Sequence, residues 1–298
     1  MKLIGIGETK DEQDIIEPWV RHNMSLLDHL IIIDGSHDDT PNILSKLVEE
    51  FNGRLEVKPQ AEFGDFQSMR TTSLLREAYK LEANFIFPLD ADEFLGTIDR
   101  KFLEQQLTKI PLGGVGNVPW RTFIVTPDTV ASCANDSPRG FQYRRIVENP
   151  LHYKVIVRTE GLSINQVWIG TGNHDCSSPL GSVPQVNLEL SLFHFPLRSY
   201  EQLLSKTVLH WIGTVAANPG IRISGGAWHV RSMFDKLLID GKLDLCALSL
   251  LYAQYENQVP ALVKEVPIFN YERKYSSGEA MNAMSLIAKS WEKSLEKL

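Results

Sequence analysis

Short apolar runs alternate with longer segments of helical periodicity over the first ninety residues of the chain. The apolar runs lie at 3–6, 30–33 and 85–89, and a short third strand is predicted at 55–57. Residues 30–33 read Leu-Ile-Ile-Ile, and a run that is apolar at every position is typical of a strand covered by helices on both faces. Because strands that alternate with helices form parallel sheets, the pattern predicts an α/β fold that binds its ligand beyond the carboxyl ends of the strands.

Three helices are predicted between these runs, at 14–27, 40–51 and about 65–83. In the first two, apolar residues recur every three or four positions, so that one face of each helix can be buried. Thr40 is expected to cap the second helix, with Pro41 in its first position.

Beyond residue 95 the pattern changes to strands joined by long polar loops. The loop at 128–140 is long enough to suggest a function of its own. The further elements that we expect are strands within 111–127 and at 154–157 and 188–195, a helix from a Ser199 cap to Ile212, helices from Met233 onward with an interruption at 260–267, and a mixed-charge helix at 280–298.

The domain organisation follows from length and composition. With 298 residues, of which 43% are hydrophobic, the chain suffices for one large core or for one domain with a smaller appendage. No linker rich in Pro, Gly or Ser marks a boundary. We predict an α/β domain at 1–215, with a mostly parallel central sheet, and a helical C-terminal extension at 216–298 packed on it.

Charge and cysteine content exclude several classes of protein. The chain carries 30 basic and 37 acidic residues, a net charge of −7, and no basic block, so nucleic acid is not an expected partner. No run approaches the roughly 20 apolar residues of a transmembrane segment, and the apolar start is too short for a signal peptide. Cys133, Cys176 and Cys246 are too far apart for a metal knuckle and do not suggest a disulfide framework. A reducing cytoplasm is the expected location.

The most informative segment is Asp90-Ala91-Asp92-Glu93, which directly follows the buried run at 85–89. Carboxylates at the end of a buried strand are typical ligands of a hard divalent cation, Mg²⁺ or Mn²⁺, that carries a phosphate on its far side. In an extended segment Asp90 and Asp92 would point to the same side and could share one cation. The alternative is that they are solvated loop acids or helix caps.

Polar residues also follow the first two strands. Asp34 ends the second strand where a ligand would lie, Gly35 permits close backbone approach, and the following helix N-terminus favours an anion. The alternative is a polar turn in which Asp38 or Thr40 caps the helix.

Asp11 and Glu12 occupy the equivalent level after the first strand. Judged alone, they are surface acids. Arg70, on the helix before the acidic segment, could neutralise a diphosphate or could be a surface arginine.

Two histidines complete the set of candidates. His194 ends a predicted strand directly before a helix, and we consider it either a third metal ligand or a core histidine. His174 and Asp175 lie in a polar loop, where either could remove a proton from a substrate, or where the segment could simply form a turn.

Four segments in this order resemble bacterial glycosyltransferases of family 2, in the subgroup with an L-D-A-D-E-F core. The resemblance covers about residues 1–210 and includes Lys206. The segments are D-E-Q-D-I-I-E-P-W-V-R-H at 11–22, L-I-I-I-D-G-S-H-D-D-T at 30–40, L-D-A-D-E-F at 89–94 and H-F-P-L-R-S at 194–199.

The resemblance implies the GT-A fold, an α/β/α sandwich that binds a nucleotide-diphosphate sugar. It implies that Asp34 contacts the nucleotide base or ribose, that Asp90 and Asp92 are the D-x-D acids with Asp92 the direct metal ligand, and that His194 completes the metal or diphosphate site. Two positions depart from the family pattern: Asp11 replaces an Asn and Asp39 replaces a Gly. The E-D pair that serves as catalytic base in the family has no clear match.

These observations lead to one functional hypothesis with two alternatives. We expect a Mn²⁺- or Mg²⁺-dependent glycosyltransferase that moves a sugar from a nucleotide-diphosphate sugar to a glycan or lipid-linked acceptor, as in the synthesis of cell-envelope polysaccharide. The family resemblance implies that the transfer proceeds with inversion. The first alternative is a non-catalytic module that binds nucleotide sugars or glycans. The second is a phosphohydrolase with Asp90 as nucleophile and Asp92 as acid, but such enzymes carry D-x-D on their first strand.

Overall fold

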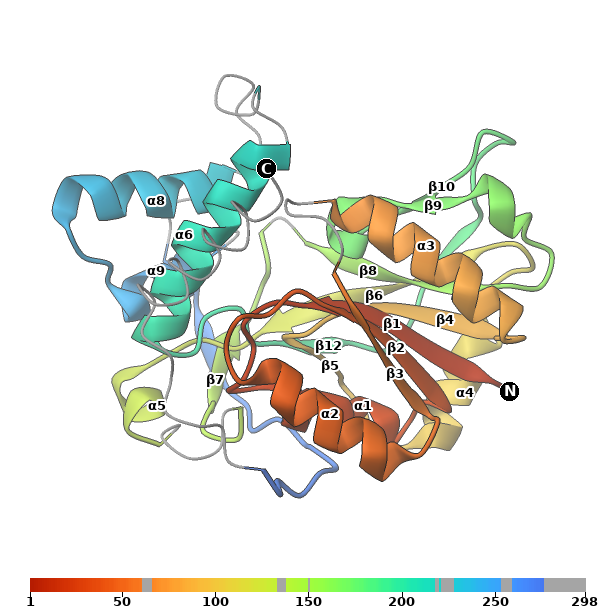
Figure 1. Cartoon of the computed structure of the whole chain (residues 1–298), viewed down its shortest axis with the longest axis horizontal. Coiled ribbons are helices and arrows are strands. Elements are labelled where there is room, and N and C mark those ends of the chain that lie inside the picture. The colour runs from red at the N-terminus through yellow and green to blue at the C-terminus, as the bar shows by residue number, and fades with distance from the viewer. Residues whose placement is uncertain are drawn as a thin grey trace.

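The computed structural model describes residues 1–60, 66–132, 138–149, 151–217, 220, 228–252 and 259–275. A nine-stranded sheet forms the centre of this part of the chain. Its strands are β1 (Leu3–Thr9), β2 (His29–Asp34), β3 (Leu55–Pro59), β4 (Phe85–Asp90), β5 (Glu93–Leu95), β6 (Val115–Thr122), β8 (Tyr153–Arg158), β11 (Gln185–Asn187) and β12 (Leu192–His194). They follow the order β3-β2-β1-β4-β8-β6-β12-β5, with β11 paired to β6. Only β8 and β5 run antiparallel to their neighbours among these strands. The predicted α/β fold with a mostly parallel sheet is confirmed (Figure 1).

Helices cover the sheet on both faces (Figure 1). α1 (Ile16–Met24), α2 (Thr40–Phe51) and α4 (Arg100–Leu107) pack on one face, and α3 (Gln67–Lys80) packs on the other. The chain therefore forms an α/β/α sandwich.

The all-apolar strand β2 shows why both layers are needed. Leu30 and Ile32 belong to the core beneath α1 and α2, whereas Ile31, between them, belongs to the core beneath α3. All three side chains are fully buried. Since burial of one such side chain contributes about 1.5–3 kcal/mol, a polar residue at any of these positions would weaken one of the two layers.

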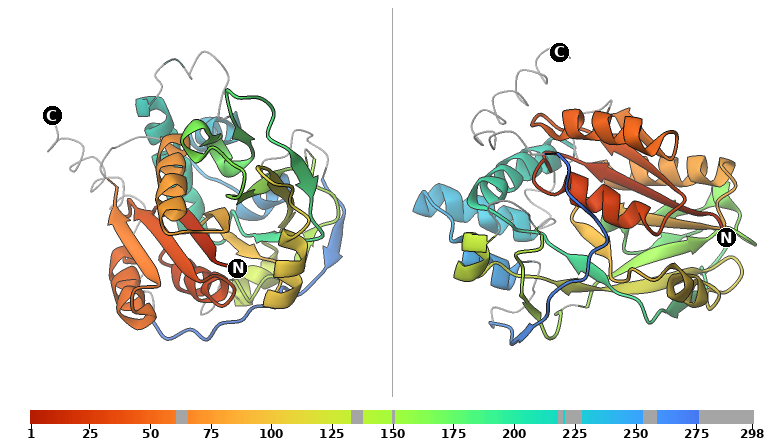
Figure 2. Two further views of the ribbon diagram at one scale, coloured as in Figure 1. Left: turned by 90° about the vertical axis from the view of Figure 1, so that its right-hand side faces the viewer. Right: turned by 90° about the horizontal axis from the view of Figure 1, so that it is seen from below.

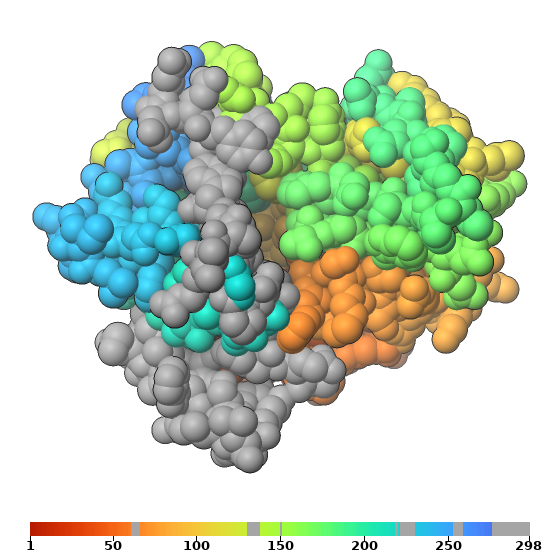
Figure 3. Space-filling model, turned by 90° about the horizontal axis from the view of Figure 1, so that it is seen from above, coloured from red at the N-terminus to blue at the C-terminus, as the bar shows by residue number. Residues whose placement is uncertain are grey.

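Three helices of the C-terminal half lie beside the carboxyl ends of the parallel strands (Figure 1). They are α6 (Tyr200–Ala217), α8 (Trp228–Asp240) and α9 (Leu245–Leu251). Seen from above, the surface is hollowed between α3 on one side and α6 on the other (Figure 3). A small separate core of Leu197, Leu203, Met233 and Leu243 joins these helices to the segment after β12.

Residues 259–275 return across the outside of the layer formed by α1 and α2 (Figure 2). A short strand, β13 (Leu262–Lys264), pairs antiparallel with β7 (Tyr143–Arg145). Farther on, the N–H of Tyr275 donates to Glu17 Oε2 at 2.9 Å. The interruption predicted at 260–267 thus contains a strand, and this part of the predicted extension is not helical.

The loop predicted at 128–140 begins as a helix, α5 (Pro127–Ser132). The N–H of Thr129 donates to Thr126 Oγ1 at 3.2 Å, and Pro127 occupies the first turn. This combination of a threonine cap and a proline favours helix initiation, so the prediction of a loop at these positions was wrong.

Other predicted boundaries shift by a few residues. Thr40 is the first residue of α2 instead of its cap, because its Oγ1 accepts the N–H of Glu12 at 3.0 Å. The strand predicted at 188–195 shortens to β12. Ser199 does cap α6, since its Oγ accepts the N–H of Gln202 at 3.1 Å.

The helix predicted at 280–298 and Cys133 lie outside the described residues. Cys176 and Cys246 are free thiols. Among the described helices, none combines the length and the apolar character that crossing a membrane demands.

Candidate metal centre

The acidic segment makes a sharp turn at the carboxyl end of β4. This strand ends at Asp90, residues 91–92 form a turn, and β5 begins at Glu93. Side chains alternate between faces only in an extended strand, so the alternation on which the prediction for Asp90 and Asp92 relied does not extend across the turn. β5 then runs antiparallel to β12, which sets His194 opposite Glu93.

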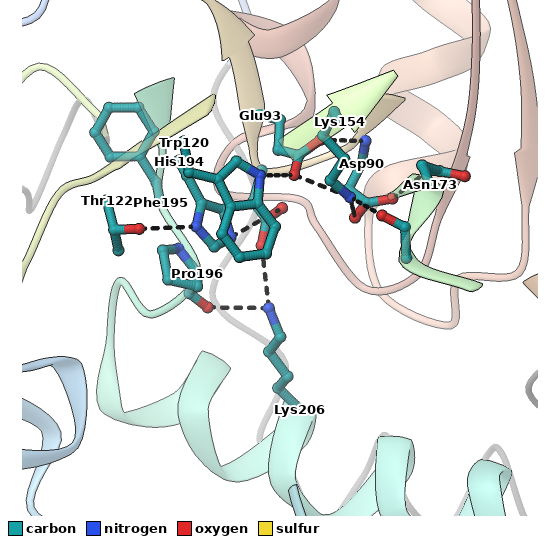
Figure 4. A network of polar contacts seen from close by, with 12 residues as sticks. Asp90, Glu93, Trp120, Thr122, Lys154, Asn173, His194, Phe195, Pro196 and Lys206 are labelled. Atoms are coloured by element: carbon teal, nitrogen blue, oxygen red, sulfur yellow. Dashed lines mark hydrogen bonds and ion pairs between the residues drawn. The ribbon is translucent and has the colours of Figure 1, made fainter. Parts of the chain in front are cut away.

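Three buried side chains converge at this turn: Asp92, Glu93 and His194. One possible ligand atom from each lies within 4.8 Å of the others, and Asp92 Oδ1 is 4.0 Å from His194 Nε2. Figure 4 shows His194 and Glu93 on neighbouring strands, facing the same space. The structure thus brings together two of the three predicted metal ligands, Asp92 and His194, and adds Glu93 to them.

Asp90, the third predicted ligand, lies outside this group and is bonded to protein donors. Its Oδ2 accepts a hydrogen bond from Lys154 Nζ at 2.5 Å. Its Oδ1 accepts from Gln67 Nε2 and from Asn173 Nδ2, each at 2.9 Å. A metal-binding role for Asp90 stays a prediction, and it would require at least one of these bonds to give way.

Glu93 is fully buried between donors from two strands. Trp120 Nε1 donates to its Oε1 at 2.6 Å, and Lys154 Nζ lies 3.1 Å from the same oxygen. Burial raises the pKa of Glu93 to about 8, against the opposing effect of the Lys154 charge.

Asp92 differs from Glu93 because its neighbouring positive charges outweigh its burial. Lys206 Nζ donates to Asp92 Oδ2 at 3.0 Å. Burial alone would raise the pKa of Asp92, but the positive charges of Lys206 and Arg198 hold it below its ordinary value. Asp92 is therefore an ionised carboxylate at neutral pH.

His194 is held on two sides. Its ring stacks on the indole of Trp120, and its Nδ1 lies 3.3 Å from Thr122 Oγ1. Burial lowers the pKa of His194 well below its ordinary value, so the imidazole is neutral. In the tautomer whose Nδ1–H donates to Thr122, the lone pair of Nε2 faces Asp92.

This donor set fits a divalent cation. An ionised carboxylate and a neutral imidazole nitrogen are ligand types that Mn²⁺ and related ions accept. Asp92 Oδ1 and His194 Nε2 lie 4.0 Å apart, and both residues would hold such an ion. Glu93 would join Asp92 and His194 as a second carboxylate by losing its proton and releasing a protein donor, since its Oε1 accepts from Trp120 and its Oε2 accepts the N–H of Asp90. Hydrogen bonds from Trp120 to Glu93 and between Thr122 and His194 supply the second layer of support that orients metal ligands in proteins.

The residues predicted for nucleotide binding line the carboxyl ends of β1 and β2. Asp34 Oδ1 accepts the N–H of Ser36 at 3.0 Å. Asp11, which adopts a left-handed backbone conformation with φ of 58°, accepts the N–H of His37 on Oδ1 at 2.6 Å. Its Oδ2 is buried without a hydrogen-bond partner among the described residues. This orphaned oxygen is consistent with a ligand at that level.

Glu12 and Arg70, also predicted to contact the ligand, are engaged in ion pairs. Glu12 is bonded to Arg198, which also binds Asp14 through Nε at 2.7 Å. Arg70 Nε donates to Glu8 Oε2 at 2.6 Å. These pairs tie the loop after β1 to the segment after β12 and tie α3 to β1.

The two predicted catalytic bases, His174 and Asp175, lie in different environments. His174 Nδ1 lies 2.8 Å from the carbonyl oxygen of Tyr153, and its ring lies edge-on to Trp120 at 5.3 Å. Burial and the nearby Lys154 charge lower the pKa of His174 to about 4. Asp175 is exposed, and its carboxylate lies against Gly170 instead.

Several residues of the site were not identified from the sequence. Lys154 could have been suspected, since a lysine inside the apolar strand β8 calls for a buried partner. Nothing in the sequence pattern points to the others, which come from separate parts of the chain: Gln67, Trp120, Thr122, Asn173 and Tyr252.

No protein-family model and no curated protein matches this chain. Solved structures that it resembles include a mannosyltransferase from Pyrobaculum calidifontis in complex with GDP-Man and Mn²⁺, at 19% identity and a TM-score of 0.33, over 39% of this chain and 35% of that chain. A second is S. aureus TarS 1–349, at 12% identity and a TM-score of 0.36, over 79% and 77% of the two chains. A third is a protein described as a nucleotide-diphospho-sugar transferase from Desulfovibrio desulfuricans, at 10% identity and a TM-score of 0.34, over 82% and 100%. Membership of glycosyltransferase family 2 stays a prediction.

Proposed function

We propose that this protein is a divalent-metal-dependent glycosyltransferase that uses a nucleotide-diphosphate sugar as donor. The observation that carries the proposal is the convergence of Asp92, Glu93 and His194 at the carboxyl end of β4. This edge of a parallel sheet is where α/β folds bind their ligands. The site also holds cationic side chains, Lys206 and Arg198, beside the metal ligands, as a diphosphate requires.

In the proposed reaction, Asp92, Glu93 and His194 would hold Mn²⁺ or Mg²⁺. Such an ion, when bound, stabilises the negative charge that develops on the departing nucleoside diphosphate. Lys206 adds a further positive charge next to Asp92, in a partly enclosed site where it is screened less than in water.

The nucleotide would lie over the ends of β1 and β2. The unpartnered Oδ2 of Asp11 is an acceptor for a donor group on the base or ribose, and Asp34 borders the same edge. The family resemblance adds inversion by a single displacement and an acceptor that is a glycan or lipid-linked. Of the two predicted bases, His174 is the better placed, because its ring contacts Trp120 while Asp175 is exposed.

The test is calorimetric titration of Mn²⁺ into the wild-type protein and into Asp92→Asn. The matched control is Asp240→Asn, which makes the same change at an exposed position at the end of α8. We expect Asp92→Asn to lose Mn²⁺ binding and the control to keep it. Equal binding by wild type and Asp92→Asn would overturn the proposed centre.

Catalysis is distinguished from mere binding by a second measurement. The protein is incubated with a panel of UDP- and GDP-sugars and Mn²⁺, and released nucleoside diphosphate is measured with and without candidate acceptors. Release that depends on Asp92 supports an enzyme. A melting temperature raised by nucleotide sugars without any release would favour the non-catalytic binding module instead.

A further inference from the structure

Two lysines, Lys154 and Lys206, contact the carboxylates of the acidic segment, but they are held differently. Lys154 Nζ contacts Asp90 Oδ2 at 2.5 Å, Glu93 Oε1 at 3.1 Å and the carbonyl oxygen of Gly172 at 2.5 Å. Its side chain is only 2% exposed. Lys154 is therefore fixed by three acceptors on separate segments of the chain.

Lys206 is less enclosed than Lys154. Its Nζ donates to Asp92 Oδ2 at 3.0 Å and to the carbonyl oxygen of Pro196 at 3.1 Å, and its side chain is 19% exposed. It reaches the site from α6, as Figure 4 shows. A flexible stem of four carbons lets its ammonium group move by several ångströms without displacing the helix.

The two oxygens of the Asp92 carboxylate therefore have different roles. One contacts the ammonium group of Lys206, and the other faces the position proposed for the divalent metal ion. Lys206 occupies Oδ2, while Oδ1 faces His194 Nε2 at 4.0 Å. A divalent ion held by Asp92 and His194 would lie a few ångströms from the ammonium group. Like charges at such a distance repel strongly in a partly buried site.

Arg198 cannot relieve this repulsion, because it is fixed. It is buried, and it binds Asp14, Glu12 and the carbonyl oxygen of Phe195. Lys206, by contrast, has a partner that would remain near it if it left Asp92, since its Nζ lies 5.3 Å from the ring centroid of Tyr252.

We propose that Lys206 is a resident counter-ion that competes with the divalent cation for Asp92 and turns to the diphosphate of the donor when the donor binds. The inference rests on the proposed function. The proposal predicts that the divalent cation binds weakly alone and more tightly together with a diphosphate. The reason is that the diphosphate pairs with the ammonium group of Lys206, which otherwise repels the cation. By linkage, the cation then strengthens diphosphate binding by the same factor.

The test uses Lys206→Met and two ligands, Mn²⁺ alone and inorganic pyrophosphate added at saturating Mn²⁺, with affinities measured by calorimetry. Removal of the ammonium group should raise the affinity for Mn²⁺ alone by about threefold or more and lower the affinity for pyrophosphate by about tenfold or more. These opposite changes distinguish competition from general damage, which would weaken both ligands.

Two further variants complete the design. Lys101→Met removes an exposed lysine of α4 with the same change of net charge, and both affinities should stay at the wild-type values. Lys206→Arg keeps the charge at the site, and its affinity for Mn²⁺ alone should stay low.

The outcomes separate the two proposals. If the wild type binds no Mn²⁺ either alone or with pyrophosphate present, the metal centre of the proposed function fails, and the inference fails with it. If the wild type binds Mn²⁺ but Lys206→Met binds it equally or more weakly, only the counter-ion role is overturned.

Discussion

The indole of Trp120 stacks on the imidazole of His194, with ring centroids 4.2 Å apart and ring planes inclined by 24°. The same indole donates from Nε1 to Glu93 Oε1 at 2.6 Å. One side chain from β6 therefore orients two candidate metal ligands that come from two different strands, β12 and β5. Partners of this kind set the orientation of metal ligands and with it the affinity of the site.

Trp120→Phe tests this arrangement, because phenylalanine keeps a ring for the stack but has no N–H for Glu93. We expect the affinity for Mn²⁺ to fall by about tenfold, the lower end of the range for lost partners of metal ligands, with no change in the far-UV circular dichroism spectrum. Trp168→Phe, at an exposed tryptophan of β9 (Trp168–Ile169), is the matched control and should leave the affinity unchanged. Wild-type affinity in Trp120→Phe would show that the indole does not orient the ligands.

Lys154→Met should destabilise the folded state, because it leaves Asp90 and Glu93 close together without their shared cation. Loss of one partner of a buried ion pair typically costs about 3–5 kcal/mol, which can be measured by urea unfolding. Adding Glu93→Gln to this variant should restore part of the loss. The control is Lys109→Met, which removes the exposed pair with Glu189 and should change stability little.

Because His22 is buried as a neutral imidazole, we expect the free energy of unfolding to fall in mild acid. Its Nε2–H donates to the carbonyl oxygen of Leu95 at 2.7 Å, and its Nδ1 accepts the N–H of Asn270 at 3.2 Å. Burial lowers the pKa of His22 from 6.5 to about 4. The unfolded chain therefore binds a proton below pH 6.5 that the folded protein does not bind until about pH 4, so the free energy of unfolding falls as the pH drops through this window.

At pH 5 the contribution of His22 amounts to about 2 kcal/mol relative to neutral pH. His22→Gln retains a donor and an acceptor but cannot titrate, so its loss of stability between pH 7 and pH 5 should be smaller by that amount. Urea unfolding of both proteins at the two pH values measures the difference. Identical losses would mean that His22 is charged in the folded protein as well.

Arg145 anchors helix α9 of the C-terminal half. Its Nη2 donates to the carbonyl oxygens of Ser249 and Tyr252 at 2.8 and 2.9 Å, and its Nε donates to that of Leu250 at 3.1 Å. These oxygens are the unpaired acceptors at the carboxyl end of α9. Arg145 thus fixes the carboxyl end of α9, and with it Tyr252, whose ring lies beside the ammonium group of Lys206.

Arg145→Lys should therefore speed amide hydrogen exchange in residues 245–251, because a lysine cannot serve three carbonyl groups in this arrangement. Exchange in β1 should not change. Arg144→Lys, whose side chain pairs with Glu265 instead, is the control and should leave α9 as it is in the wild type. Unaltered exchange at 245–251 in Arg145→Lys would contradict the anchoring role.

The first half of the fold could be predicted because its strands are buried on both faces, so that each strand is marked by a short run of neighbouring apolar residues. Residues 30–33 are apolar at every position, and the structure divides them between the two helical layers as that pattern requires. The helix α5 was not predicted although Thr126 and Pro127 form a recognisable start, because a long polar stretch is typical of a loop.

The candidate site was predicted less completely, and Asp90 shows why. The sequence places Asp90 and Asp92 at the end of a strand, but it does not contain the turn at 91–92 or the donors from Gln67, Asn173 and Lys154 that occupy Asp90. Those donors come from three separate segments, and no local pattern links them to the acidic residues.

The sequence by itself determined the alternation of strands and helices, the parallel sheet, and the carboxylates at the end of β4, because hydrophobic periodicity and strand ends are properties of neighbouring residues. Only the tertiary structure decided which carboxylate joins His194 and Glu93 and which is held by lysine. That choice depends on how β5 returns along β12 and on how β8 and α6 present their ammonium groups, so it is set by packing between segments distant in the chain.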